Sequence, residues 1–153
     1  MNVLVIGSGG REHAIVRHLA ELVRPQGCVY LVDVEMTAMR TLGASPDVLD
    51  LMDRYVQFHQ QRGNDPQIGL RLGELLRSAG LTVLDHTGTF SVISPPPGLR
   101  PPSWAARDAM VAAGVATPDD VARWQRALER LDAQQERPTM FLPHFTATGR
   151  RPA

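Results

Sequence analysis

Near the start of the chain, three glycines and an acid have the types and spacing of a phosphate-binding site. Gly7, Gly9 and Gly10 follow one short apolar run, and Asp33 lies at the end of the next. A glycine turn between a strand and a helix lets backbone N–H groups approach a phosphate, and an acid after the following strand can hold a ribose hydroxyl. The pattern indicates nucleotide or phosphate binding at these four candidate cofactor-binding residues, or simply the tight turn that such a unit needs.

The residues beside the glycine turn depart from the dinucleotide fingerprint. Glu12 stands where a third Gly or Ala is expected, and its charge would repel an anion at close range. His13, two residues after Arg11, could contact an anion, although a single His near a helix start is more often an ordinary surface residue. These neighbours favour a turn over a complete dinucleotide site.

A group of acids follows this region and could chelate a metal. It consists of Asp33, Glu35, Asp47, Asp50 and Asp53. The last three are spaced i, i+3, i+6, which is typical of a solvated face in the first turns of a helix. We therefore predict no metal site.

Five other residues have side chains that could do chemistry, and each has a structural interpretation. Cys28 opens an apolar strand, which favours a core position over a nucleophile. Trp104 and Trp124 lie on helix faces and are expected to pack. His86 and His144 belong to strands that could be neighbours, so a shared site is conceivable but not favoured. No catalytic residue can be named.

The composition excludes several classes of protein. All sixteen basic residues are Arg and they balance sixteen acids, which excludes a Schiff-base Lys and argues against nucleic acid or a polybasic membrane anchor as partners. One Cys permits no intrachain disulfide. No apolar run approaches the roughly 20 residues of a membrane span, and the start lacks a secretory n-region. We expect a cytoplasmic location and no membrane partner.

The pattern of apolar residues predicts alternating strands and helices. A strand at 2–6, a helix ending before Pro25 and a strand at 28–34 form a parallel, right-handed βαβ unit. Further helices are expected at 46–62, 65–79, 103–113 and 118–137, and further strands at 81–93 and 139–148.

Local signals refine these elements. Ser45 and Thr117 are expected to cap helices, Thr117 through a capping box. Gly80 has the position of a C′ glycine. We expect an interruption of the strand near Gly88, and a bulge or an edge position at Pro143. The proline-rich segment 94–102, between the strand at 81–93 and the helix at 103–113, is expected to be a stiff connector.

The first fourteen residues carry a specific family resemblance. They read Met-Asn-Val-Leu-Val-Ile-Gly-Ser-Gly-Gly-Arg-Glu-His-Ala and resemble the N-terminus of glycinamide ribonucleotide synthetase (phosphoribosylamine–glycine ligase). In that ATP-grasp ligase, the glycine loop lies on the substrate phosphate side. A chain of 153 residues without Lys cannot contain an ATP-grasp module. What this resemblance implies is a small nucleotide- or phosphate-binding module.

Later segments carry a second resemblance. Residues 16–27 read as a helix and turn before a strand, and residues 63–72 read Gly-Asn-Asp-Pro-Gln-Ile-Gly-Leu-Arg-Leu. Together with residues 117–124 and 141–152, they resemble the C-terminal half of a class I S-adenosylmethionine-dependent methyltransferase, in the style of high-GC actinobacteria. The family usually has Leu-Arg-Pro-Gly-Gly at the turn, so Gln26 replaces one Gly.

This second resemblance implies a fold. It implies an α/β domain at 1–153 with a partial Rossmann-like methyltransferase sheet, three-layered and mixed, with one antiparallel strand. The expected sheet order is 2–6, 28–34, 139–148 and 81–93, with 139–148 antiparallel between its neighbours.

The same resemblance implies a methyltransferase that uses S-adenosylmethionine and a small-molecule methyl acceptor. In the resembled family, the donor-binding loop and the ribose-binding acid come before the segments matched here, and neither is expected before residue 15, where there is no room for them. Only Glu35 to Arg40 corresponds to a wall of the acceptor pocket. We therefore expect a truncated methyltransferase that is weak or inactive alone. The alternatives are the nucleotide- or phosphate-binding module and a non-enzymatic domain that self-associates through an exposed sheet edge.

Overall fold

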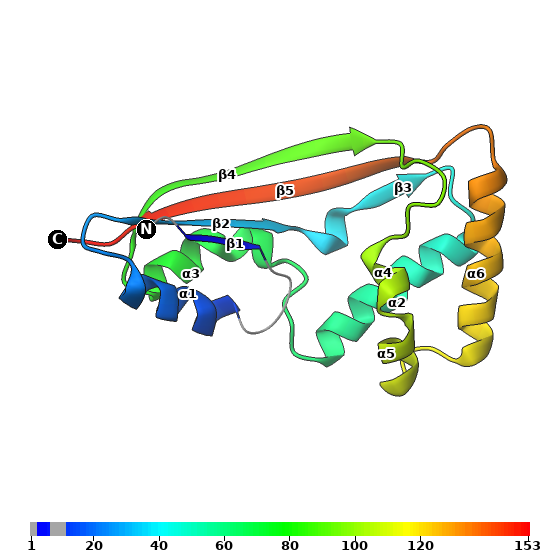
Figure 1. Cartoon of the computed structure of the whole chain (residues 1–153), viewed down its shortest axis with the longest axis horizontal. Helices are drawn as coiled ribbons and strands as arrows, with labels where there is room; N and C mark the ends of the chain where they lie inside the picture. Colours follow the sequence, from blue (N-terminus) through cyan, green and yellow to red (C-terminus); the bar gives the residue numbers. More distant parts are fainter. Residues whose placement is uncertain (1–2, 7–11) are drawn as a thin grey trace.

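The chain forms one mixed sheet with its helices below it (Figure 1). The computed structural model describes the backbone of residues 3–6 and 12–153, and side chains from residue 14 onward. The described elements are β1 (Val3–Ile6), α1 (Glu12–Leu22), β2 (Cys28–Val34), the 3-10 turn η1 (Met36–Ala38), β3 (Arg40–Leu42), α2 (Pro46–Gln61), η2 (Ile68–Arg71), α3 (Leu72–Ser78), β4 (Thr82–Ile93), α4 (Pro102–Ala105), α5 (Arg107–Ala112), α6 (Pro118–Ala133) and β5 (Thr139–Arg150). Among these residues, no helix has the length and apolar character that a membrane span requires.

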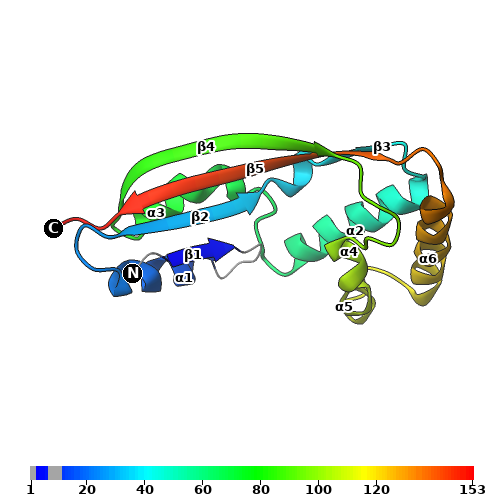
Figure 2. The same cartoon turned by 45° about the horizontal axis from the view of Figure 1, so that its top comes forward.

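The sheet has the strand order predicted from the sequence. β1 pairs in parallel with β2, and β5 lies antiparallel between β2 and β4 (Figure 2). β2 and β4 therefore run in the same direction, with one reversed strand between them. The mixed α/β class and the single antiparallel strand at the predicted position are confirmed.

The short strand β3 was not predicted, and it explains why a proline is tolerated inside the sheet. β2 ends opposite His144 of β5, and β3 begins opposite Phe141 on the same side of that strand. Leu142 and Pro143 fall in the gap between them, while the other side of β5 pairs Pro143 with Phe90. Because proline cannot donate a ladder hydrogen bond, it belongs at such a local edge. The edge position expected for Pro143 is thus found without a bulge.

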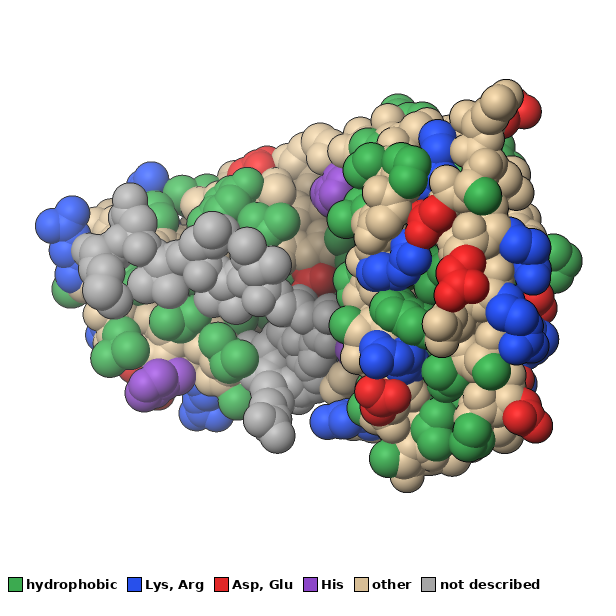
Figure 3. Space-filling model, turned by 45° about the vertical axis from the view of Figure 1, so that its right-hand side comes forward, with side chains coloured by type: hydrophobic (Ala, Val, Ile, Leu, Met, Phe, Trp, Pro, Cys, Tyr) green, Lys and Arg blue, Asp and Glu red, His purple; other side chains and the backbone are tan. Residues whose placement is uncertain are grey.

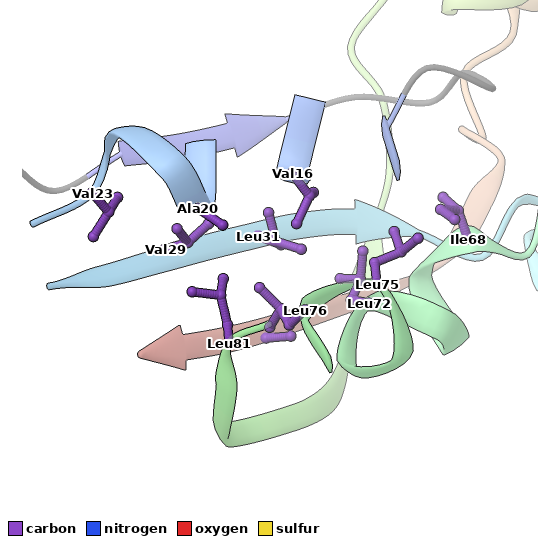
Figure 4. Close-up of a cluster of buried hydrophobic side chains, with 11 residues drawn as sticks. Val16, Ala20, Val23, Val29, Leu31, Ile68, Leu72, Leu75, Leu76 and Leu81 are labelled. Atoms are coloured by element: carbon purple, nitrogen blue, oxygen red, sulfur yellow. The ribbon is translucent and has the colours of Figure 1, made fainter. Parts of the chain in front are cut away.

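A first hydrophobic core lies between the sheet and two helices. Leu31 of β2 and Ala147 of β5 pack against the apolar stripes of α1 and α3, with Val16 and Leu76 among the fully buried side chains (Figure 4). Both helices contact the same face of the sheet, since right-handed crossovers in one direction place them there. The described helices thus form two layers with the sheet instead of the predicted three.

A second hydrophobic core joins the remaining helices at the far end of the sheet. Trp124 of α6 is fully buried against Leu51 of α2 and Met110 of α5, and Trp104 of α4 packs against this cluster. The packing role predicted for both tryptophans is confirmed.

Three element predictions need correction. The helix expected at 65–79 is divided into η2 and α3, and the helix expected at 103–113 into α4 and α5. The strand β4 passes through Gly88 without interruption, and its irregularity lies between Val83 and Asp85. Gly88 is closely packed there, since a Cβ would lie 2.9 Å from the Phe145 ring.

The turn after α1 contains Gln26, the one non-glycine residue with a positive φ in the described part of the chain. Gln26 has φ 63°, and its N–H donates to the Arg151 carbonyl over 3.0 Å. A side chain in this region of backbone space is unfavourable, which is why glycine is preferred there. Position 26, where the resembled family usually has glycine, is therefore one at which this fold needs a backbone conformation with positive φ.

The two predicted helix caps behave differently, and this difference is testable. Thr117 accepts from the Asp120 N–H and completes a capping box, whereas Ser45 makes no cap bond and its hydroxyl is buried without a partner among the described residues. Thr117→Ala should lower the free energy of unfolding by about 1 kcal/mol. Ser45→Ala should leave it unchanged or raise it, because a buried unsatisfied hydroxyl is removed. Urea unfolding of both variants checks this; equal losses would contradict it.

Candidate functional site

The candidate site lies at the carboxyl ends of β1 and β2, where the sequence predicted ligand binding. Ile6 is opposite Val32, so Asp33 is the first residue of β2 beyond the end of β1. Gly7, Gly9 and Gly10, together with Arg11, lie outside the described residues, as does the side chain of His13. The binding role of the three glycines and Asp33 stays a prediction.

Asp33 and Glu35 are buried acids at this edge. Asp33 is 7% exposed, and its Oδ1 accepts from the Val34 N–H over 2.7 Å. Glu35 is also buried; its Oε1 accepts from the N–H of Thr37 over 3.0 Å and from the Thr37 hydroxyl. Glu35 therefore caps η1 and holds the chain that follows β2.

The turn η2 is packed tightly against the end of β2. A Cβ at Gly69 would lie 2.8 Å from Phe145 and 3.0 Å from the Val34 carbonyl oxygen. Gln67 donates from its amide to the Thr37 hydroxyl over 3.2 Å, and the Met36 N–H donates to the Pro66 carbonyl over 2.8 Å. The two chain segments after β2 and before α3 thus form one fixed wall.

The end of α2 contains a buried polar side chain that the sequence analysis did not single out. His59 is buried, its Nδ1 accepts from the Asn64 amide over 2.9 Å, and its ring lies 4.5 Å from the Tyr55 ring. Burial raises the pKa of Tyr55. The only sequence signal was the helix-terminating Gly63-Asn64 pair. Figure 3 shows the surface hollowed between the two ends of the molecule, with histidine and acidic atoms visible in the hollow.

The described residues of this edge do not fit a methyl-donor site of the resembled family. Such a site needs an acid whose carboxylate faces the ligand and accepts from ribose hydroxyls. Asp33 lies at the end of a strand, but it is buried and one of its oxygens accepts from the N–H of its own neighbour Val34. Glu35 is engaged by Thr37.

The structure separates the two strand histidines. His86 pairs with Ala147 and His144 with Thr89, and these pairs lie an odd number of positions apart, so the two rings point to opposite faces of the sheet. His86 donates from Nε2 to the Gly69 carbonyl over 3.0 Å, and His144 lies 3.2 Å from the Ser91 hydroxyl. The strands are neighbours, but no shared histidine site exists.

The helical aspartates are not merely solvated, which corrects the sequence prediction for two of them. Arg123 of α6 donates to Asp47 over 2.7 Å, to Asp50 over 2.8 Å and to Asp120 over 2.7 Å. Asp50 also accepts from the Trp124 indole over 2.8 Å. These bonds connect α2 to α6 above the second core. Among the described residues, no group of three or more His, Cys, Asp or Glu is placed to hold a metal.

The same network lowers the pKa values of two carboxyl groups. Burial raises the pKa of Asp50, but hydrogen bonds from Trp124 and Arg123 outweigh it and bring the pKa below its ordinary value. Hydrogen bonds from Arg123 and Thr117 lower the pKa of Asp120 to about 2. Both groups therefore favour the folded state in their ionised form.

A pH prediction follows from the Asp120 carboxyl. The pKa of Asp120 is about 2 in the folded state, below its pKa in the unfolded chain. Its contribution to the free energy of unfolding is therefore fully present above the unfolded-state pKa and is lost as the pH falls toward 2. In Arg123→Gln this loss should become smaller, because the main cause of the shift is gone. Urea unfolding at a series of acidic pH values measures it. Arg126→Gln, an exposed position of the same helix, is the control and should keep the wild-type slope.

Two cavities lie away from this edge. One, of about 270 Å³, is lined by Arg100, Trp104, Arg107, Gln125, Leu128 and Glu129. Its two guanidinium groups are engaged, since Arg107 lies 4.7 Å over the Trp104 ring and Arg100 donates to Asp132 over 2.6 Å. The other, of about 550 Å³, lies between α1 and the residues after α3, at the opposite end of β2 from Asp33. Neither contains a predicted site residue.

Comparisons with known proteins give structural similarity without sequence similarity. No protein-family model and no curated protein matches the sequence. A protein named "putative methyltransferase" from Bacillus halodurans C-125 is similar in structure over 99% of this chain and 64% of its own, with 10% identity and a TM-score of 0.48. A "putative sarcosine dimethylglycine methyltransferase" from Galdieria sulphuraria is similar over 97% of this chain and 52% of its own, with 15% identity and a TM-score of 0.37.

This chain thus spans less than two thirds of the length of either protein. Both similar structures are named as methyltransferases, and neither name refers to the ligase that residues 1–14 resemble.

Proposed function

We propose that the chain is the acceptor-side half of a class I S-adenosylmethionine-dependent methyltransferase, with weak or no methyl transfer of its own. The observation that supports this is the position of β5, antiparallel between the parallel strands β2 and β4. That arrangement is the one expected from the resemblance of residues 15–153 to the family. A reversed strand inside a parallel sheet is a specific feature, because simple βαβ repetition gives parallel neighbours only.

The buried acids support the second part of the proposal. The methyl donor supplies an electrophilic methyl group when it is bound, and catalysis requires that it be held in a preorganised site. Asp33 is buried and accepts from the N–H of its neighbour Val34. The family resemblance carries none of the donor-binding residues over to a position in this chain. Tight donor binding is therefore not expected.

What this chain's own residues provide is one wall of an acceptor pocket. Glu35 caps η1, and the bond from the Met36 N–H to Pro66 fixes that turn against the start of η2. The segment from Glu35 to Arg40 is the one that the resemblance assigns to the acceptor side. A fixed wall of this kind orients a small acceptor without moving any proton.

Donor binding in two settings tests the proposal. Calorimetric titration of this chain with S-adenosylmethionine should show no saturable binding at millimolar donor. A hybrid in which residues 15–153 follow the donor-binding half of a class I methyltransferase should fold and bind the donor. Tight binding by the chain alone, or a folded hybrid that binds none, would contradict the proposal.

A second candidate function is nucleotide or sugar-phosphate binding at the start of the chain. The parallel register that places Asp33 just beyond the end of β1 favours it, because the glycines follow β1 directly. Gly9→Asp should then abolish the affinity for ATP or ribose 5-phosphate, measured by the same titration. Unchanged affinity in the variant would exclude this function.

A further inference from the structure

β4 presents a long sheet edge without a strand partner. Its residues from Thr82 to Ile93 pair with β5 on one side, and no other described strand pairs with it (Figures 1 and 2). An edge of this kind exposes a row of backbone donors and acceptors that can bind another strand. The register with β5 is continuous from Asp85 to Ile93, so this part of the edge is regular.

The edge lacks most of the features that prevent such binding. Natural edges are commonly protected by Lys, Pro or inward-pointing charges, and β4 contains no Lys, Arg or Pro and one acid, Asp85. The bulge after Val83 protects only its first residues. Phe90 and Val92 are 66% and 61% exposed, which is unusual for large apolar side chains on a regular strand.

The sequence of β4 is nearly palindromic in character about Gly88. Thr87 and Thr89 flank the glycine, then come the aromatic residues His86 and Phe90. Continuing outward, the polar pair is Asp85 and Ser91. Beyond this pair, the bulge between Val83 and Asp85 ends the regular register. In an antiparallel pair of two such strands centred on Gly88, each residue would lie opposite one of its own kind. Such pairs stabilise sheets.

We propose that β4 pairs with β4 of a second copy of this chain, antiparallel about a twofold axis at Gly88. The two sheets then form one continuous sheet with a closed, isologous interface. The charges agree with this register. Each Asp85 lies opposite a Ser91, and the two Asp85 side chains are separated by six positions along the strand, roughly 20 Å.

The position of α3 beneath β4 also agrees with this register. At the His86 end, α3 lies beneath β4, since a Cβ at Gly73 would be 3.0 Å from the His86 ring. At the Phe90 end, the same face is exposed. Antiparallel pairing places the exposed end of one copy beside the helix-covered end of the other. Phe90 thereby loses contact with water next to the partner's His86.

Sedimentation equilibrium of the full chain at pH 8 tests the pairing. The wild type should have twice the 16.8 kDa of the monomer. Thr89→Asp should be monomeric, because the pair would then hold four carboxylates close together on one face, two from Asp85 and two from the new residues. The double variant Thr87→Arg with Thr89→Asp should regain the dimer, since each new Arg lies directly opposite a new Asp only in this register. Leu42→Asp, an exposed position of β3 away from the edge, is the control and should stay dimeric.

Each outcome decides the proposal, which does not rest on methyl transfer or donor binding. Circular dichroism melts establish that every variant is folded. A monomeric wild type, a Thr89→Asp variant that stays dimeric, or assemblies larger than a dimer would overturn it. A folded double variant that remains monomeric would overturn the register about Gly88.

Discussion

Trp124→Ala should lower the free energy of unfolding by about 3–5 kcal/mol, among the largest losses that one substitution in this chain can cause. Trp124 is 0% exposed and lies in the second core, among residues of α2, α5 and α6. The change leaves a cavity of indole size and removes the donor to Asp50.

Trp124→Phe separates packing from hydrogen bonding. Phenylalanine keeps most of the apolar burial but cannot donate, so the loss should be about 1.5–3 kcal/mol, the usual contribution of one hydrogen bond to a charged group, because Asp50 still accepts from Arg123. Urea unfolding followed by far-ultraviolet circular dichroism measures both variants without depending on tryptophan fluorescence. If Trp124→Ala cost less than Trp124→Phe, the second core would not be packed around this residue.

Gly69→Ala should lower the free energy of unfolding by about 1–3 kcal/mol, the usual cost of forcing a group into filled space. The new methyl group would meet the Phe145 ring at 2.8 Å and the Val34 carbonyl at 3.0 Å. The carbonyl belongs to the backbone of β2 and cannot rotate away, so η2 itself must move. The polar wall built by Thr37 and Gln67 would move with it.

Gly73→Ala is the matched control for this prediction, four residues further along. Its new Cβ would lie 3.0 Å from the His86 ring, a side chain that can shift, and alanine is favoured over glycine in a helix by about 1 kcal/mol. Gly73→Ala should therefore be neutral or stabilising in the same urea experiment. Equal losses at the two positions would contradict the close contact between η2 and β2.

Much of the fold could be predicted because its signals are local. The strand at 28–34 and the start of the helix at Pro46 are marked by apolar runs and a proline. The capping box at Thr117 was predicted correctly from four residues. The order of strands came from the family resemblance, which supplied the long-range information that periodicity lacks.

The features that were missed depend on tertiary contacts. The division of the 65–79 helix arises where Gly69 meets β2, and no local pattern contains that contact. Arg123 donates hydrogen bonds to three carboxylates from two helices. The i, i+3 spacing of Asp47 and Asp50 alone could not indicate this. Glu35 was treated as one of several acids, although its role as the cap of η1 is visible in the spacing to Thr37.

A thermal melt of the purified chain with and without S-adenosylmethionine tests the central claim most directly. A ligand at 100 times its dissociation constant would add about 2.7 kcal/mol, which raises the melting temperature of a domain of this size by several degrees. The proposed acceptor-side half should melt cooperatively at a temperature that the donor does not change. A cooperative melt raised by the donor would contradict the claim, because it would mean that these residues form a donor site after all.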